Sequence, residues 1–114
     1  MILSFAWTTE QFLAGIKTVS RRDWSERTLR MWQKAWDDGR LEHDAYSKIP
    51  IAGGKKIGRF KLTARPYKER LRDMPVEDLA KEGFGDRFRT VQEYIDFISQ
   101  SPDKALSVIR FMKL

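Results

Sequence analysis

Residues 15–22 read Gly-Ile-Lys-Thr-Val-Ser-Arg-Arg and mark the point where a predicted short helix gives way to a predicted strand. The helix is indicated upstream by the capping-box spacing that begins at Thr8. Gly15 suits the end of this helix because glycine adopts a positive φ without steric cost. Residues 16–22 are rich in β-branched and small polar side chains, which favour a strand. The cation Lys17 is therefore expected at the junction between helix and strand.

Strands and short helices alternate outward from this junction. Runs with strand-like composition or alternation occupy residues 1–7, 16–22, 41–46, 55–64 and 105–112. Capping patterns, proline and helical periodicity predict helices that begin near residue 8 and that cover residues 24–37, 75–83 and 90–98. The helices near residues 8 and 76 are too short to cross the face of a parallel sheet. We therefore expect an α+β domain built around a small, mixed but mostly antiparallel barrel.

The size and composition fit one domain, residues 1–114, because a division would leave neither half enough apolar surface to bury. Hydrophobic residues make up 41% of the chain, which is sufficient material for a packed core. The chain has no cysteine, which excludes disulfides and thiolate metal sites and favours a reducing, cytoplasmic location. The apolar run over residues 1–7 is much shorter than the roughly 20 residues of a membrane span, so no membrane segment is expected.

The charge balance favours polyanionic partners. Lys and Arg total 22 against 16 acidic residues, which gives a formal net charge of +6 and a pI near 9.8. Nucleic acid is the partner class that this balance favours, although basic proteins without any specific anionic ligand have similar charge. The sequence leaves the oligomeric state open.

The pattern Gly15-x-Lys17-x-x-x-x-Arg22 resembles the signature of the ASCH domain, a β-barrel family related to the PUA fold of RNA-modification proteins. Residues 81–84, Lys-Glu-Gly-Phe, resemble the Glu-Gly step that follows a short helix in this family. Residues 108–111 resemble its closing strand. The resemblance implies a PUA-like β-barrel with short flanking helices.

Residues 24–54 resemble no part of the family's smallest members, and we interpret them as an insertion. Its helix, at about 24–37, is predicted from a capping pattern at Asp23 and from apolar residues at helical spacing up to Trp36. With its tryptophans on the surface, this helix would serve as the contact face of a protein-interaction adaptor. An adaptor is therefore one functional alternative.

Two further alternatives follow from the resemblance. Members of the family are associated with RNA binding, which implies a basic cleft for RNA or for a nucleoside derived from it. One bacterial branch contains amidohydrolases that remove the acetyl group from acetylcytidine with a proposed triad of Lys, a Thr three residues later, and the Glu of the Glu-Gly step. The corresponding residues here are Lys17, Ser20 and Glu82. Ser20 keeps the hydroxyl but lacks the methyl group that restricts the rotamer of Thr.

The chemistry of these residues suits both binding and hydrolysis. A partly desolvated lysine can lose its proton and accept that of a neighbouring hydroxyl, which then attacks an amide carbonyl. A carboxylate can protonate the leaving nitrogen, and Arg22 can bind a ring carbonyl or a phosphate. On a regular strand, however, Lys17 and Ser20 would face opposite sides because side chains alternate. The triad therefore requires a bend within residues 15–18.

Further nucleic-acid contacts are predicted from a basic strand and one tryptophan. The basic residues are Lys55, Lys56, Arg59 and Lys61. They either follow a phosphate backbone or protect an edge strand from pairing. Trp24 closely follows Arg22 and is a candidate for the border of the cleft, with packing in the core as the alternative.

No metal site and no cofactor are predicted. His43 is the single histidine, and the chain has no cysteine that could complete a metal site with it. Residues 53–55, Gly-Gly-Lys, lack the upstream glycine and the following Ser or Thr of a phosphate-binding loop. The expected ligand is RNA or a nucleoside, with no metal and no cofactor.

Overall fold

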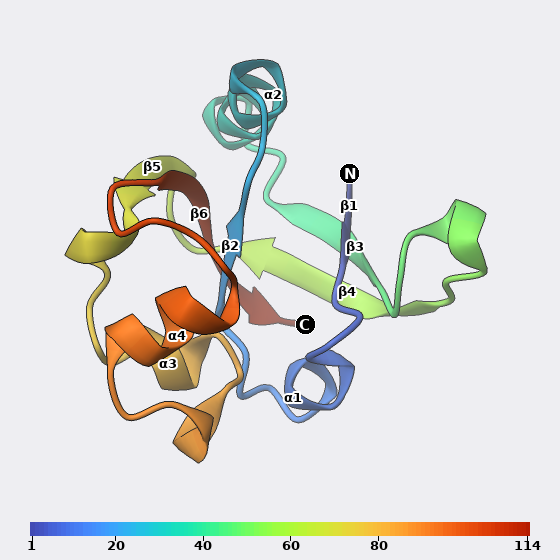
Figure 1. Cartoon of the computed structure of the whole chain (residues 1–114). Coiled ribbons are helices and arrows are strands. Elements are labelled where there is room, and N and C mark those ends of the chain that lie inside the picture. The colour runs from blue at the N-terminus through green and yellow to red at the C-terminus, as the bar shows by residue number, and fades with distance from the viewer.

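A curled, mixed sheet forms half a barrel at the centre of a small α+β domain (Figure 1). The computed structural model describes residues 1–114, with every side chain except that of Asp86. The strands are β1 Ile2–Ser4, β2 Val19–Arg22, β3 Glu42–Tyr46, β4 Lys56–Leu62, β5 Tyr67–Arg70 and β6 Ala105–Lys113. Their order is β1-β3-β4-β6-β2, and β5 pairs with β6 beside this path. β1 and β3 are parallel, whereas β3–β4 and the pairs that β6 forms are antiparallel.

The long strand β6 holds the two halves of the sheet together. One of its edges pairs with β5 near its start and with β4 near its end, where Phe111 lies opposite Leu62. Its other edge pairs with β2, where Ile109 lies opposite Ser20. Ile109 and Phe111 are buried on one face of the strand. The remaining strands therefore curl around an apolar interior that β6 lines.

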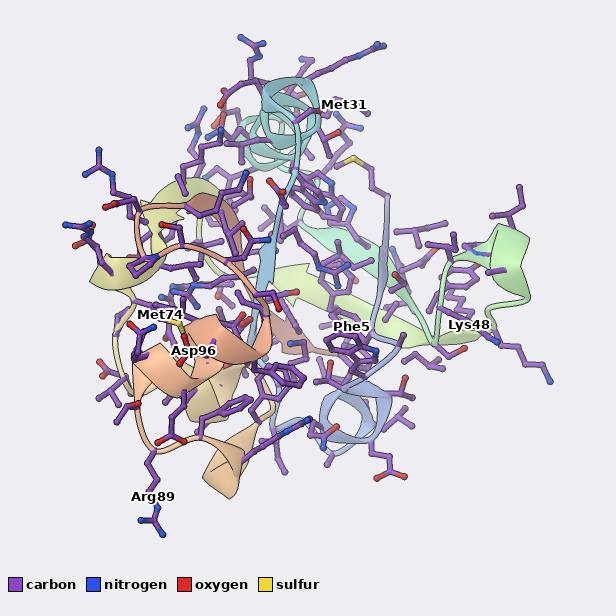
Figure 2. All side chains as sticks on the ribbon, viewed as in Figure 1. Phe5, Met31, Lys48, Met74, Arg89 and Asp96 are labelled. Atoms are coloured by element: carbon purple, nitrogen blue, oxygen red, sulfur yellow. The ribbon has the colours of Figure 1, made fainter. Side chains whose placement is uncertain are left out.

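This interior is the larger of two cores. Its buried members are Leu3, Phe5, Phe12, Trp32, Ala45, Phe60, Leu62, Ile109 and Phe111. Figure 2 shows Phe5 near the centre of the domain, whereas Lys48 and Arg89 project away from it. β1 and β2 are the two ends of the strand order, so the half-barrel stays open between them. We call the opening between β1 and β2 the seam.

Four α-helices and three short 3-10 turns complete the domain. The helices are α1 Thr9–Leu13, α2 Glu26–Asp37, α3 Asp78–Lys81 and α4 Val91–Phe97, and the turns are η1 Pro50–Ala52, η2 Leu71–Asp73 and η3 Gly85–Arg87. α3 and α4 lie together on one side of β2 (Figure 1). They pack around the second core, formed by Leu71, Met74, Leu79, Tyr94, Ile95 and Leu106. Within the described residues, no helix has the length and apolar character needed to cross a bilayer.

The helix predicted over residues 24–37 is confirmed as α2, but its start was assigned wrongly. Ser25, not Asp23, is the N-cap, because its hydroxyl oxygen accepts the backbone N–H of Thr28 at 3.2 Å. Asp23 forms an ion pair with Lys104 at 3.3 Å instead. The Trp32 side chain on this helix lies in the core.

Residues 24–54 also supply β3, which lies between β1 and β4 in the sheet. This segment is therefore an integral part of the half-barrel rather than an appendage to it. Two other elements differ from the sequence prediction. The helix expected from Pro75 begins only at Asp78, since a tight turn precedes it in which Asp78 N–H donates to the Pro75 carbonyl at 3.0 Å. β5, over Tyr67–Arg70, was not predicted.

Candidate functional site

A cavity of about 330 Å³ lies at the seam, between the β1–α1 segment on one side and α3 and α4 on the other. The first wall comes from Ser4, Phe5, Ala6, Trp7 and Thr8, the second from Lys17, Ser20, Arg21 and Arg22, and the third from Glu82, Phe84, Tyr94 and Ile98. The open half-barrel accounts for this location, because β1 and β2 are not joined by a backbone ladder there. The cavity thus combines charged groups with aromatic rings.

Lys17 enters the cavity because the chain reverses before β2. Gly15 has a φ of +75°, and the backbone N–H groups of Ile16 and Lys17 both donate to the carbonyl of Gln11. Residues 16–18 therefore lie outside the regular strand, and the bend that the triad required is present. The Lys17 side chain is only 4% exposed.

The environment of the Lys17 amine makes its proton easier to lose than that of an exposed lysine. Nζ donates to the backbone carbonyl oxygen of Glu82 at 2.6 Å and lies 5.8 Å from the centre of the Phe5 ring. Burial lowers the pKa of Lys17 to about 8, although the nearby Glu82 carboxylate acts in the opposite direction. A lysine with this pKa can exchange a proton near neutral pH.

Glu82 reaches the cavity from the C-terminal end of α3. Its Oε1 accepts the backbone N–H of Arg21 at 3.0 Å, and its Oε2 accepts the hydroxyl of Tyr94 at 3.4 Å. The residue is 2% exposed, and burial raises its pKa against the lowering effect of Lys17 and Arg21. Desolvation, together with the Glu82 charge, also raises the pKa of Tyr94. Glu82 is therefore a buried carboxyl group that can hold or release a proton.

Arg22 and Ser20 share one face of β2, two residues apart, as strand geometry requires. Arg22 Nε donates to Ser20 Oγ at 2.8 Å, and its Nη2 donates to the backbone carbonyl of Ser4 at 2.5 Å. The guanidinium lies 5.5 Å from the centre of the Phe5 ring. Burial lowers the pKa of Arg22, with Glu82 opposing this effect. Arg22 thus bridges the seam and holds the Ser20 hydroxyl.

A second charged cluster lies on the other face of β2 and holds α3 in place. Arg21 Nη2 donates to Asp78 at 2.7 Å and to Glu69 at 2.6 Å. Asp78, which is 1% exposed, also accepts from Arg110 at 2.8 Å. Asp78 and Glu82 are one helical turn apart, so Arg21 binds the first by its side chain and the second by its backbone. The sequence prediction missed this cluster.

The four principal site residues predicted from the sequence meet in the cavity: Lys17, Ser20, Arg22 and Glu82. The direct contact between lysine and hydroxyl that the triad implies is not formed among the described side chains. Lys17 Nζ binds the Glu82 carbonyl, whereas Ser20 Oγ accepts from Arg22. Ser20 keeps its own hydroxyl proton free to be donated.

The other predicted binding residues lie elsewhere. Trp24 stacks on Trp32 with ring centres 5.3 Å apart and does not line the cavity. It is half-buried against the core, as is Trp36, so the tryptophans on which the adaptor alternative depended do not form an open surface. His43 is buried, with Nε2 2.9 Å from the carbonyl oxygen of Arg40.

The basic strand lies apart from the cavity as well, and its residues are Lys55, Lys56, Arg59 and Lys61. Lys56 and Arg59 each lie 3.2 Å from a carboxylate oxygen of Asp44 on the neighbouring strand β3. These ion pairs neutralise part of the positive charge, while Lys61 remains exposed. The arrangement fits a solvated strand face better than a continuous phosphate track.

Comparisons with known proteins return no match: no protein-family model, no curated protein and no solved structure is similar to this chain. The function of the site is therefore inferred from its own geometry and from the sequence pattern that led to it.

Proposed function

We propose that this domain is an ASCH-like, PUA-like module that binds RNA or a nucleoside derived from it and receives one base in the cavity at the seam. The observation that carries this proposal is the convergence of Lys17, Arg22 and Glu82 on one partly buried cavity beside aromatic rings. Its volume of about 330 Å³ lies near the lower end of the roughly 300–1,000 Å³ typical of ligand pockets. A small planar ligand suits such a site.

The polar groups suggest how a base would be held. Lys17 and Arg22 are donors, and they complement a ring carbonyl oxygen or a phosphate. The carboxylate of Glu82 is an acceptor and complements an exocyclic amine. Cytosine has a ring carbonyl and an exocyclic amine on one edge, so it complements this set of groups. The aromatic side chains Phe84 and Tyr94 provide apolar contact with the ring.

A binding titration tests the proposal. Labelled single-stranded and structured RNAs, together with free cytidine and acetylcytidine, are titrated at two salt concentrations with the wild-type protein and with Lys17→Ala. We expect salt-dependent RNA binding that Lys17→Ala weakens at least about tenfold, since a charged donor to the ligand is lost. Lys34→Ala removes the same charge from the exposed face of α2 and serves as the control. Absent or salt-insensitive binding, or equal losses in both variants, contradicts the proposal.

A second candidate function is the hydrolysis of an acylated amine such as acetylcytidine, and the lowered pKa of Lys17 beside a free hydroxyl proton favours it. In this reaction Ser20 Oγ attacks the amide carbon while Lys17 Nζ accepts its proton. Glu82, in its protonated form, delivers a proton to the leaving nitrogen as the C–N bond breaks. Water then hydrolyses the ester on Ser20. The Lys17 amine must leave the Glu82 carbonyl to reach Ser20.

The hydrolase proposal has its own test. The protein is incubated with acetylcytidine, and release of cytidine is followed by chromatography. We expect release by the wild-type protein and its loss in Lys17→Ala and Ser20→Ala. Equal rates in wild type and Lys17→Ala rule out the triad, and a bound but unchanged ligand leaves the binding function alone.

A further inference from the structure

Trp7 stands at the mouth of the cavity with most of its surface in solvent. It follows β1, lines the cavity with part of its side chain, and is 74% exposed. Eleven large hydrophobic side chains are exposed among the described residues, and Trp7 is the only aromatic one in that set. The others are aliphatic or methionine side chains. A large ring that remains in water beside a binding cavity is a candidate for ligand contact.

The exposed indole belongs to a cluster of aromatic rings beside the cavity. Trp7 meets Phe97 of α4 edge to face, with ring centres 5.7 Å apart. Phe97 is in turn 6.0 Å from Phe84, which lines the cavity. Trp7 comes from the β1–α1 segment and Phe97 from α4, so the contact spans the mouth between two walls of the site. This surface is therefore built from elements distant in sequence.

A cation completes the cluster. The guanidinium carbon of Arg87 lies 4.3 Å from the centre of the Phe97 ring and within 6.0 Å of the centres of Phe84 and Phe88. Stacking on a ring restricts the guanidinium while its N–H groups, which lie in the plane, remain able to donate to a phosphate. We call Trp7, Phe97 and Arg87 the rim.

We infer that the rim binds the nucleotide next to the one in the cavity. The base of this nucleotide stacks on Trp7, and its phosphate lies near Arg87. The ligand is therefore a single-stranded RNA segment rather than a free nucleoside. This inference rests on the proposed function. Aromatic platforms beside cations are the usual means by which proteins hold successive bases of a single strand. The net charge of +6 agrees with a polyanionic ligand. The rim therefore gives a physical reason why the domain would bind single-stranded RNA more tightly than a free nucleoside.

The test compares a single nucleoside with a short strand that adds neighbouring nucleotides and their phosphates. Affinities for cytidine and for a trinucleotide of cytidine are measured by calorimetry for the wild-type protein, Trp7→Ala and Arg87→Ala. We expect the trinucleotide to bind at least about tenfold more tightly than cytidine, because stacking adds to the affinity. Trp7→Ala lowers the affinity for the trinucleotide more than that for cytidine and removes this advantage, so that the two ligands bind with affinities within about threefold of each other. Arg87→Ala lowers the slope of log affinity against log salt by about 1 for the trinucleotide alone.

Controls separate a failure of the inference from a failure of the proposed function. Ile51→Ala removes another exposed apolar side chain, from η1, and is expected to leave both affinities unchanged. Equal affinities for cytidine and trinucleotide, or equal losses for both ligands in Trp7→Ala, overturn the inference while the cavity remains a base-binding site. No binding of either ligand by the wild-type protein overturns the proposed function and the inference with it. Unchanged thermal unfolding of Trp7→Ala verifies that the variant is folded.

Discussion

Arg22 Nη2 donates to the backbone carbonyl of Ser4 at 2.5 Å and so connects β2 to the end of β1, the two strands at opposite ends of the sheet order. A closed barrel would join these two strands by a backbone ladder, which leaves no gap between them. Here one side chain makes the connection, and the space around it becomes the cavity. The same guanidinium also fixes the Ser20 hydroxyl. The link across the seam and the position of the Ser20 hydroxyl therefore depend on the same residue.

Replacing Arg22 should loosen the seam. Arg22→Ala removes two hydrogen bonds from a charged donor, to Ser4 and to Ser20. Each is worth roughly 1.5–3 kcal/mol, so we expect the free energy of unfolding in urea to fall by at least about 3 kcal/mol. Amide hydrogen exchange at residues 4–8 should quicken at the same time. Arg27→Ala, on the exposed side of α2, is the control. Unchanged stability with unchanged exchange would show that Arg22 does not bridge the strands in solution.

Glu82 should set the proton affinity of Lys17. The carboxylate raises the pKa of Lys17 against the lowering effect of burial, so Glu82→Gln is expected to move this pKa below about 8. The pKa is measured by NMR titration of the labelled lysine side chain. Glu93→Gln, at an exposed position of α4, should leave it unchanged. A rise of the Lys17 pKa in Glu82→Gln contradicts the electrostatic coupling.

Lys17 should also make stability depend on pH in the alkaline range. Its pKa is about 8 in the folded protein and near its ordinary value of 10.5 when unfolded. Between these values the unfolded chain binds more protons, so the free energy of unfolding rises with pH. The gain from this one group reaches about 3 kcal/mol at most. In Lys17→Met the rise between pH 8 and 10 should disappear, and a similar rise in both proteins would assign it to other groups.

Asp78 should be needed for the placement of Glu82. Asp78→Ala leaves the buried side chain of Arg21 without its closest carboxylate on α3 and removes a partner of Arg110. Breaking a buried ion pair in this way costs roughly 3–5 kcal/mol, measured as a fall in the free energy of unfolding in urea. Ligand affinity should fall too, since α3 carries Glu82. Asp73→Ala removes an exposed carboxylate from the neighbouring turn η2 and should cost less than about 0.5 kcal/mol.

Much of the site could be predicted from local pattern. The resemblance of residues 15–22 and of the Glu-Gly step to the ASCH pattern identified four of the polar residues that line the cavity, namely Lys17, Ser20, Arg22 and Glu82. Alternating strands and short helices predicted an α+β fold with a barrel-like sheet, and the half-barrel agrees with that coarse description. These features were accessible because short-range geometry determines them: a glycine reversal, a two-residue strand period and a helix cap.

The parts that were missed depend on contacts between distant segments. Trp7 looked like the end of a buried strand, and only the packing of α4 against it shows that it stands at the cavity mouth. Arg21 and Asp78 are 57 positions apart, so neither sequence neighbourhood indicates the ion pair. Arg21 and Arg22 are neighbours on β2 and therefore point to opposite faces of the strand. The residues that Arg21 and Arg22 contact on these two faces could be identified only once the sheet topology was known.

The carboxylate of Glu82 has a second consequence through its bond to the backbone N–H of Arg21. That N–H lies on the free edge of β2, the strand at the end of the sheet order. An unprotected edge of this kind can pair with a strand of another polypeptide. The neighbouring Lys81 carbonyl occupies the N–H of Thr18 at 2.8 Å on the same side. Glu82, a residue of the proposed binding site, thus also shields this sheet edge from pairing with a second copy of the chain. Variants of Glu82 made to alter ligand binding therefore carry a risk of aggregation.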